Sequence, residues 1–243
     1  MNAALREADG LAKRLWHDEL VRTPETHAWV LDLYRAGERH PETVDDYFPW
    51  RAAVDPWPQL ASELKRHAAE ERGHAHLYAR AIRSLGKEPE DLGGLDVFNH
   101  AIRAETAIAW QLGPGDPVPM RRLALAHFLA HAHCLERRVA RSLEHHHRAC
   151  RRAGKAAIAE LVERVLRDEE RHVASTLRGL SELTSTAERE RILAFHAEAE
   201  ARADRAFSAR QVRSFLRRFP ERGGRSLRLG FRLGACVLEA RRG

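Results

Sequence analysis

The sequence predicts an all-α fold: four long helices form a bundle, with a long crossover between two hairpins and extra helices at the C-terminal end. Of the 243 residues, 44% are apolar, enough for a sizeable core, and long runs of Ala, Leu, Arg and Glu favour helix over strand. Apolar residues recur every three to four positions along several segments. Pro and Gly separate these segments, so each is expected to be one helix.

The first two long helices are expected in the N-terminal part of the chain. Thr23 followed by Pro24 provides an N-cap and a proline in the first turn, so a helix is expected to begin there. Pro41 is expected to kink this helix rather than end it, because apolar positions continue as far as Phe48. A proline-rich turn follows, and the second helix is predicted over residues 59–85.

The second pair of long helices follows a crossover. Residues 86–119 begin with a glycine suited to a helix C-cap and include GPGDPVP, and they are expected to form this connection with a short helix near 97–112. The third and fourth helices are predicted over 120–152 and 155–183, with a break at Gly154. Such a long connection lets two helical hairpins pack side by side.

Three parts are expected along the chain. Residues 1–23 form an N-terminal extension, residues 24–183 form the bundle, and residues 184–243 form a basic helical extension with one helix near 187–205. From Arg202 onward there are twelve Arg and three acidic residues. A tail of this charge attracts phosphates or acidic surfaces, or is simply a solvated Arg-rich helix.

Two of the long helices carry the sequence Glu-x-x-His. The copies are Glu71 with His74 and Glu169 with His172. Residues three apart lie on one helix face, so each pair presents a carboxylate oxygen and an imidazole nitrogen to one point in space. One copy alone is weak support for a site, because the chain contains 15 His and many acidic residues.

Each copy has a carboxylate partner on the preceding helix. Glu38 precedes Glu71 by 33 residues, and Glu136 precedes Glu169 by the same 33. In an antiparallel hairpin this spacing brings the paired carboxylates to about the same height. Because Pro41 lies about one turn after Glu38, other acids are alternatives for its place, namely Glu25, Glu42, Asp45 and Asp46.

A buried group of carboxylates and histidines is costly unless its charge is compensated. Two divalent cations would offset four carboxylates, and oxygen with imidazole ligands suits iron or manganese better than a thiolate-seeking metal. The pattern therefore predicts two iron ions, with manganese as the alternative. The predicted ligands are Glu38, Glu71, His74, Glu136, Glu169 and His172.

These six residues resemble the metal ligands of the ferritin-like di-iron carboxylate superfamily, which includes rubrerythrin, bacterioferritin and tRNA-modifying di-iron hydroxylases. The stretches HAAEERGHAHLYARAIRSLG and LVERVLRDEERHVASTL look closest to an uncharacterised branch of ferritin-like domain proteins. The resemblance covers residues 24–183 and does not extend to 184–243. It implies a ferritin-like four-helix bundle and chemistry at a di-iron centre.

Other polar residues are candidates for supporting roles. Asp168 is expected either to orient a ligating histidine from another helix or to be exposed, and Tyr78 either to lie near the metals or to be core. The run His145–His147 is expected to have a structural or surface role, because consecutive helical residues point about 100° apart. One of His127, His131 and His133 is a candidate hydrogen-bond partner or proton carrier near Glu136, or a core histidine.

Composition also bears on the compartment. Cys134, Cys150 and Cys236 are few, odd in number and not spaced as C-x-x-C, so reduced thiols are expected. The first twenty residues contain no apolar run suited to a signal peptide, and no later run approaches a membrane span. A cytoplasmic protein is expected, and a homodimer is compatible with the sequence.

The leading functional hypothesis is an oxidoreductase in which a di-iron pair uses dioxygen, with electrons from an unidentified donor, to oxidise or hydroxylate an unknown substrate. One alternative is a tRNA base hydroxylase that holds RNA through the Arg-rich tail. Another is a metal-free helical interaction module with a buried polar network. Metal content separates the last from the first two.

Overall fold

A computed structural model describes residues 3–39, 47–92, 105–106, 112–222 and 224–240. Within these ranges the protein is all helical and contains no β-strand, which confirms the predicted all-α class. None of the helices in the described ranges is long and apolar enough to cross a membrane. In chain order the helices are α1 (Ala3–Leu20), α2 (Pro24–Glu38), α4 (Trp50–Ala53), α5 (Pro58–Ser84), α7 (Val118–Arg152), α8 (Ala156–Leu183), α9 (Thr186–Arg218) and α10 (Arg225–Ala240).

Helix α2 begins where predicted but ends earlier than predicted. The Thr23 hydroxyl accepts from the backbone N–H of Thr26, and the Thr26 side chain bonds back to the Thr23 backbone, which forms a reciprocal cap. The helix stops at Glu38, so its expected continuation to Phe48 is wrong. Proline disfavours helical geometry in the residue before it, which is the physical reason for an end ahead of Pro41.

Tyr47 and Phe48, which the sequence analysis placed in the first long helix, are buried without being helical. Pro41 and Val44 lie outside the described residues, as do Glu42, Asp45 and Asp46. Tyr47 and Phe48 form a bend, yet each is only 6% exposed. Their apolar character therefore reflected packing against the core rather than helical periodicity.

Glycines in the left-handed region end α5 and α7. Gly86 has φ 71°, its N–H donates to the carbonyl of Arg83, and the next N–H, of Lys87, donates to Ile82. This is a Schellman cap, in which a side chain at the glycine would be strained. Gly154 has φ 70° between α7 and α8. Both breaks lie where the sequence predicts them.

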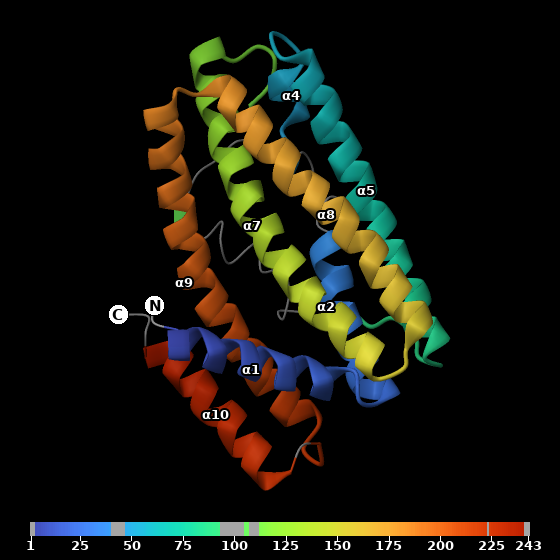
Figure 1. Ribbon diagram of the computed structural model, residues 1–243. Helices are drawn as coiled ribbons and strands as arrows, with labels where there is room; N and C mark the ends of the chain where they lie inside the picture. Colours follow the sequence, from blue (N-terminus) through green and yellow to red (C-terminus); the bar gives the residue numbers. More distant parts are fainter. Residues whose placement is uncertain (1–2, 40–46, 93–104, 107–111, 223, 241–243) are drawn as a thin grey trace.

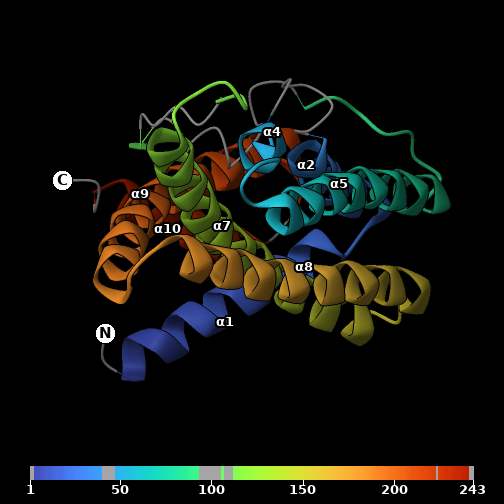
Figure 2. The ribbon, with the colours of Figure 1, turned by 90° about the horizontal axis from the view of Figure 1, so that it is seen from above.

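Two helical hairpins form the bundle. Helix α2 pairs with α5, and α7 pairs with α8, while contacts between α5 and α8 join the two hairpins (Figure 1). Figure 2, viewed from above, shows α5 and α8 side by side. The predicted third and fourth helices agree with α7 and α8 within two residues at each end. The short helix expected near 97–112 falls almost entirely outside the described residues.

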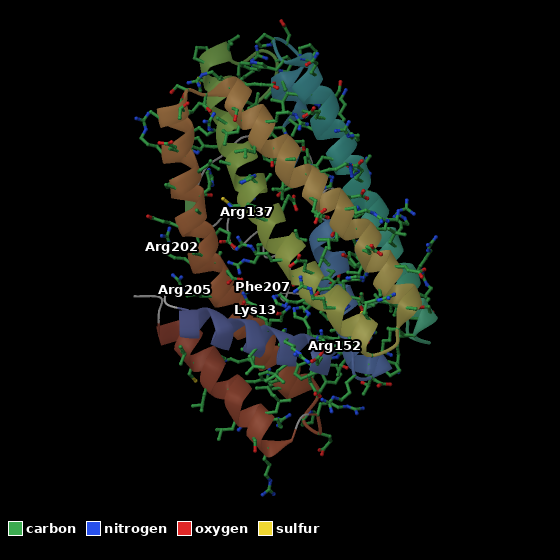
Figure 3. The ribbon with its side chains drawn as sticks, viewed as in Figure 1. Lys13, Arg137, Arg152, Arg202, Arg205 and Phe207 are labelled. Atoms are coloured by element: carbon green, nitrogen blue, oxygen red, sulfur yellow. The ribbon has the colours of Figure 1, made fainter. Side chains whose placement is uncertain are left out.

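Besides the short α4, three helices of the described residues, α1, α9 and α10, lie outside the four-helix core. Helix α9 extends to Arg218, well beyond the predicted end near Arg205, so it contains the segment VRSFLRR, with the following Phe219 as its C-cap. It packs along α7, and α10 packs on α9 (Figure 1). Helix α1, which the sequence analysis did not predict, crosses beside the end of α7, where Arg152 donates to Asp18 at 3.1 Å. Arg152 is labelled in Figure 3.

These added helices share the protein's apolar core. One buried cluster combines α1, α2 and α9, and its members are Leu20, Trp29, Val30, Leu33, Phe215 and Leu216. The ring of Trp16 contacts Phe215 and also Phe231 of α10, at centroid distances of 5.0 and 5.1 Å. The N-terminal and C-terminal extensions therefore cover apolar surface of the bundle.

Candidate metal centre

The six predicted ligand residues converge inside the bundle from its four long helices. Glu38 ends α2, Glu136 lies on α7, and α5 and α8 each contribute one Glu-x-x-His pair. Two groups of side chains each have one donor atom per residue within 4.8 Å of the others. The first cluster contains Glu38, Glu71, His74 and Glu169, and the second contains His67, Glu71, Glu136 and His172. Glu71 belongs to both clusters, so its carboxylate lies between them.

The first cluster is centred on Nδ1 of His74. This nitrogen lies 3.3 Å from Oε2 of Glu38 and 3.2 Å from Oε1 of Glu169. His74, Glu38 and Glu169 are 2%, 6% and 1% exposed. A nitrogen and carboxylate oxygens from three helices thus face one another in a space that water barely reaches.

The second cluster contains a histidine that the sequence analysis missed. Nε2 of His67 lies 3.1 Å from Oε1 of Glu71 and 3.4 Å from Oε1 of Glu136. The His67 ring stacks on His172 with centroids 3.6 Å apart, and Nδ1 of His172 lies 3.0 Å from Glu169. His67 precedes Glu71 by four residues, so its position on the same face of α5 was the available signal.

Each histidine of the two Glu-x-x-His pairs contacts a carboxylate on the other helix. Nε2 of His74 lies 3.1 Å from Oδ2 of Asp168 on α8. Nε2 of His172 lies 2.8 Å from Oε2 of Glu70 on α5. In both cases the acid immediately precedes the Glu of the opposite motif, so the arrangement is reciprocal. A carboxylate that accepts the outer N–H fixes the ring and its tautomer, as is usual for metal-binding histidines.

Crowding of these groups shifts their protonation. Burial, reinforced by the charge of Glu169, raises the pKa of Glu136 to about 8. Burial and the neighbouring Glu71 likewise raise the pKa of Glu38. Burial opposes a charged imidazole, yet the carboxylates of Glu136 and Glu71 raise the pKa of His67 to about 10. The buried carboxylates are therefore stable only with compensating positive charge, which either protons or metal cations can supply.

The donor set fits a pair of cations. The two clusters offer carboxylate oxygens and imidazole nitrogens and no sulfur, a combination suited to iron or manganese. Oε1 of Glu169 is buried, and although Nδ1 of His74 lies 3.2 Å away, no hydrogen bond to this oxygen forms; a buried oxygen left unsatisfied costs about 1–3 kcal/mol. A cation between the clusters would contact this oxygen and offset that cost.

A cavity of about 170 Å³ opens directly beside the carboxylates. Glu38, Glu71 and Glu136 line one side of it, and the hydroxyl of the fully buried Tyr78, which also lines it, has no hydrogen-bond partner. The rest of the wall is mainly apolar. Helix α9 contributes Phe207 to it, and Figure 3 labels this residue on α9. The cavity thus lies between the bundle and the added helix.

The remaining sequence candidates lie elsewhere. Glu25, an alternative to Glu38, is 45% exposed and pairs with Lys87 at 2.8 Å. His127 pairs with His196 of α9 at 3.1 Å, and His133 contacts the carbonyl of Val173. None of these belongs to either cluster of the described residues.

A comparison with known protein families identifies the family of this chain. The ferritin-like domain family matches residues 50–185, more than half of the chain, and this match includes α5, α7 and α8. The chain therefore belongs to the ferritin-like domain family. Searches of curated proteins and of solved structures gave no significant match.

Proposed function

We propose that the bundle binds two metal ions, one at each cluster, with the carboxylate of Glu71 shared between them. The observation that carries this proposal is the overlap of two buried donor groups at a single carboxylate. The proposed ligands are the six residues predicted from the sequence, with His67 added to the second cluster. Asp168 and Glu70 hold the outer nitrogens of His74 and His172.

Iron is the proposed metal, with manganese as the alternative, because the donors are oxygens and imidazoles. A reduced di-iron pair held by these residues would supply dioxygen activation, and we propose an oxidase or oxygenase activity on this basis. Electrons come from a donor outside this chain. Family membership supports the class of site, whereas the step to a reaction rests on analogy within a fold that hosts several chemistries.

The cavity suggests the kind of substrate. Its wall near the carboxylates contains the aromatic rings of Tyr47, Phe48 and Phe128, and its volume of about 170 Å³ suits a small molecule. Arg138 closes the α9 side by contacting Glu200 at 2.6 Å and Asp204 at 3.2 Å. The aromatic rings would hold a small, largely apolar substrate beside the site, and the ion pairs of Arg138 would keep water away.

Metal analysis tests the proposal directly. The full chain, reconstituted anaerobically with ferrous iron, is expected to hold about two irons, in line with ferritin-like carboxylate sites. Glu169→Ala and His172→Ala should each lose most of this iron. Glu169 contacts histidines of both clusters, and His172 belongs to the second cluster and contacts Glu169. Glu163→Ala on the exposed face of α8 is the matched control and should keep it. Iron far below two per chain in the unmodified protein would support the metal-free interaction module instead.

Oxygen consumption tests the reaction class separately. The iron-loaded protein, given a chemical reductant, is expected to consume dioxygen, and the His172→Ala variant is expected to do so much more slowly. A protein that binds two irons without reacting with dioxygen would keep the metal site and overturn the oxidase assignment.

The RNA alternative is weakened because some arginines of the tail already contact groups of the protein itself. Arg218 contacts Glu90 at 2.6 Å, and Arg228 donates to backbone carbonyls, including those of Phe219 and Arg222. Deleting residues 206–243 would remove cavity-lining residues of α9, so substitution is the cleaner test. Arg217, Arg225 and Arg232 are exposed, so each can be replaced by Gln. RNA binding that is sensitive to salt and that falls in these variants would support this alternative.

A further inference from the structure

A third group of side chains with metal-ligand atoms lies at one end of the bundle, apart from both carboxylate clusters. His27 comes from the first turn of α2, and His146 and Cys150 come from the last part of α7, four residues apart on one helix face. All three side chains are 0% exposed. The group shares no residue with the first or the second cluster.

The separations of the donor atoms match a tetrahedral ion. Nε2 of His27 lies 3.1 Å from Nε2 of His146 and 3.6 Å from Sγ of Cys150. Bonds of about 2.0–2.1 Å to nitrogen and about 2.3 Å to sulfur, set at tetrahedral angles, place two nitrogens about 3.3 Å apart and a nitrogen about 3.6 Å from a sulfur. These two separations therefore already suit one ion, and the three donor atoms all lie within 4.8 Å of one another.

The protonation states also suit metal binding. Burial lowers the pKa of His27 to about 3 and that of His146 well below its usual value, so both imidazoles are neutral at pH 7. Burial raises the pKa of the Cys150 thiol to about 12, so the thiol keeps its proton until a cation replaces it. The group is therefore uncharged, unlike the carboxylate clusters.

The surroundings of this group are apolar and aromatic. Cys150 belongs to a buried cluster with Leu31, Leu143 and Val162, and the ring of Tyr34 packs edge-on against His146 at 5.3 Å. On the α1 side, the 5% exposed His17 packs against His146 with centroids 5.8 Å apart, and its Nδ1 has no hydrogen-bond partner. His17 therefore borders the group without belonging to it.

We propose that His27, His146 and Cys150 bind one thiophilic transition-metal ion, of which zinc is the expected member. Sulfur and imidazole donors select zinc or copper over the iron or manganese favoured by the carboxylate clusters. Binding breaks the S–H bond of Cys150 and forms a metal–sulfur bond, and the proton leaves to solvent. The proton shared between the two Nε2 atoms moves to Nδ1 of its own ring, so one proton is released per ion. The ion links α2 to α7 at the α1 end of the bundle.

Cobalt titration distinguishes this site from the carboxylate clusters. Metal-stripped, thiol-reduced full chain is titrated anaerobically with Co²⁺, because a cobalt–thiolate bond absorbs in the near ultraviolet and carboxylate or imidazole ligands do not. The unmodified protein is expected to develop this absorption to the level of one cobalt–thiolate bond per chain and to lose it when Zn²⁺ is added.

Variants identify the ligands. Cys150→Ser should abolish the absorption, whereas Cys134→Ser, at a half-buried cysteine on the same helix, and Cys236→Ser, at an exposed one, should keep it. His27→Gln should weaken cobalt binding at least tenfold, and helical circular dichroism with cooperative thermal unfolding reports that each variant is folded. Absorption that is absent in the unmodified protein, or that survives Cys150→Ser, would overturn the proposal and leave a hydrogen-bonded histidine pair. Neither result depends on whether the carboxylate clusters bind iron.

Discussion

At the scale of single residues, the carboxylates behind the histidines are expected to tune metal affinity. Asp168→Asn keeps the size of the side chain but weakens its hold on Nε2 of His74, so we expect ferrous affinity to fall by about 10–100-fold while stoichiometry at saturation is kept. Competition with a chromogenic chelator measures this. Glu170→Gln, at the exposed position two residues further along α8, is the control. Equal affinities for both variants would show that Asp168 does not support the site.

The hydroxyl of Tyr78 gives a second prediction at this scale. It is buried without a hydrogen-bond partner, and the tyrosine pKa is raised by burial and by the nearby Glu38 and Glu169. Tyr78→Phe removes an unsatisfied polar group, so the free energy of unfolding of the metal-free protein should rise by about 1 kcal/mol. Urea denaturation measures the change. A loss of stability would mean that the hydroxyl has a partner.

At the scale of helices, Gly179 marks a close contact of α8 with α5 and α7. A Cβ at this position would lie 3.1 Å from Leu60 of α5 and 3.3 Å from Leu129 of α7, whereas a Cβ at Gly73 would meet nothing within 4 Å. Gly73→Ala should stabilise the metal-free protein by about 0.5–1 kcal/mol through helix propensity. Gly179→Ala should be about 1–2 kcal/mol less favourable than that, because the leucines must move. Similar values for the two variants would contradict this packing.

The contact between α7 and α9 predicts a pH dependence. Burial lowers the pKa of His196 to about 3, and His127, its hydrogen-bond partner, is also lowered by burial, with Glu188 opposing. The unfolded chain binds a proton at His196 below about pH 6.5 while the folded protein does not, so stability falls as pH decreases from 6.5 toward 3. Between pH 7.5 and 5.5 this group should remove about 1 kcal/mol. Urea unfolding with a chelator present should show a smaller loss for His196→Gln, and an equal loss would contradict the assignment.

At the scale of the whole molecule, local signals predicted the bundle and non-local packing decided the rest. The cap at Thr23 and the left-handed Gly86 and Gly154 act within a few residues, so the sequence located these helix ends. The end of α2 was misplaced because Phe48 is buried by distant helices rather than by helical periodicity. His67 was missed because its role depends on residues from α7 and α8.

The length of α9 was underestimated for the same reason. Its large apolar residues are few and pack against α7, α10 and a cluster shared with α1 and α2, so no strong periodicity marks the helix. The predicted division into an extension, a bundle over 24–183 and a basic tail stays a proposal. The apolar cluster shared by α1, α2 and α9 argues that the bundle and its extensions fold as one unit.

Two truncations distinguish one folding unit from several. A chain ending at Leu183 lacks α9 and exposes the α2 residues Trp29, Val30 and Leu33, which Phe215 covers in the full chain. We expect this chain to bind an apolar dye strongly, to lose cooperative thermal unfolding and to hold little iron, because the wall of the cavity is also gone. A chain ending at Arg222 lacks only α10 and should keep both cooperative unfolding and iron. Cooperative unfolding with full iron content in the shorter chain would show instead that the bundle folds by itself and that its boundary lies near residue 183.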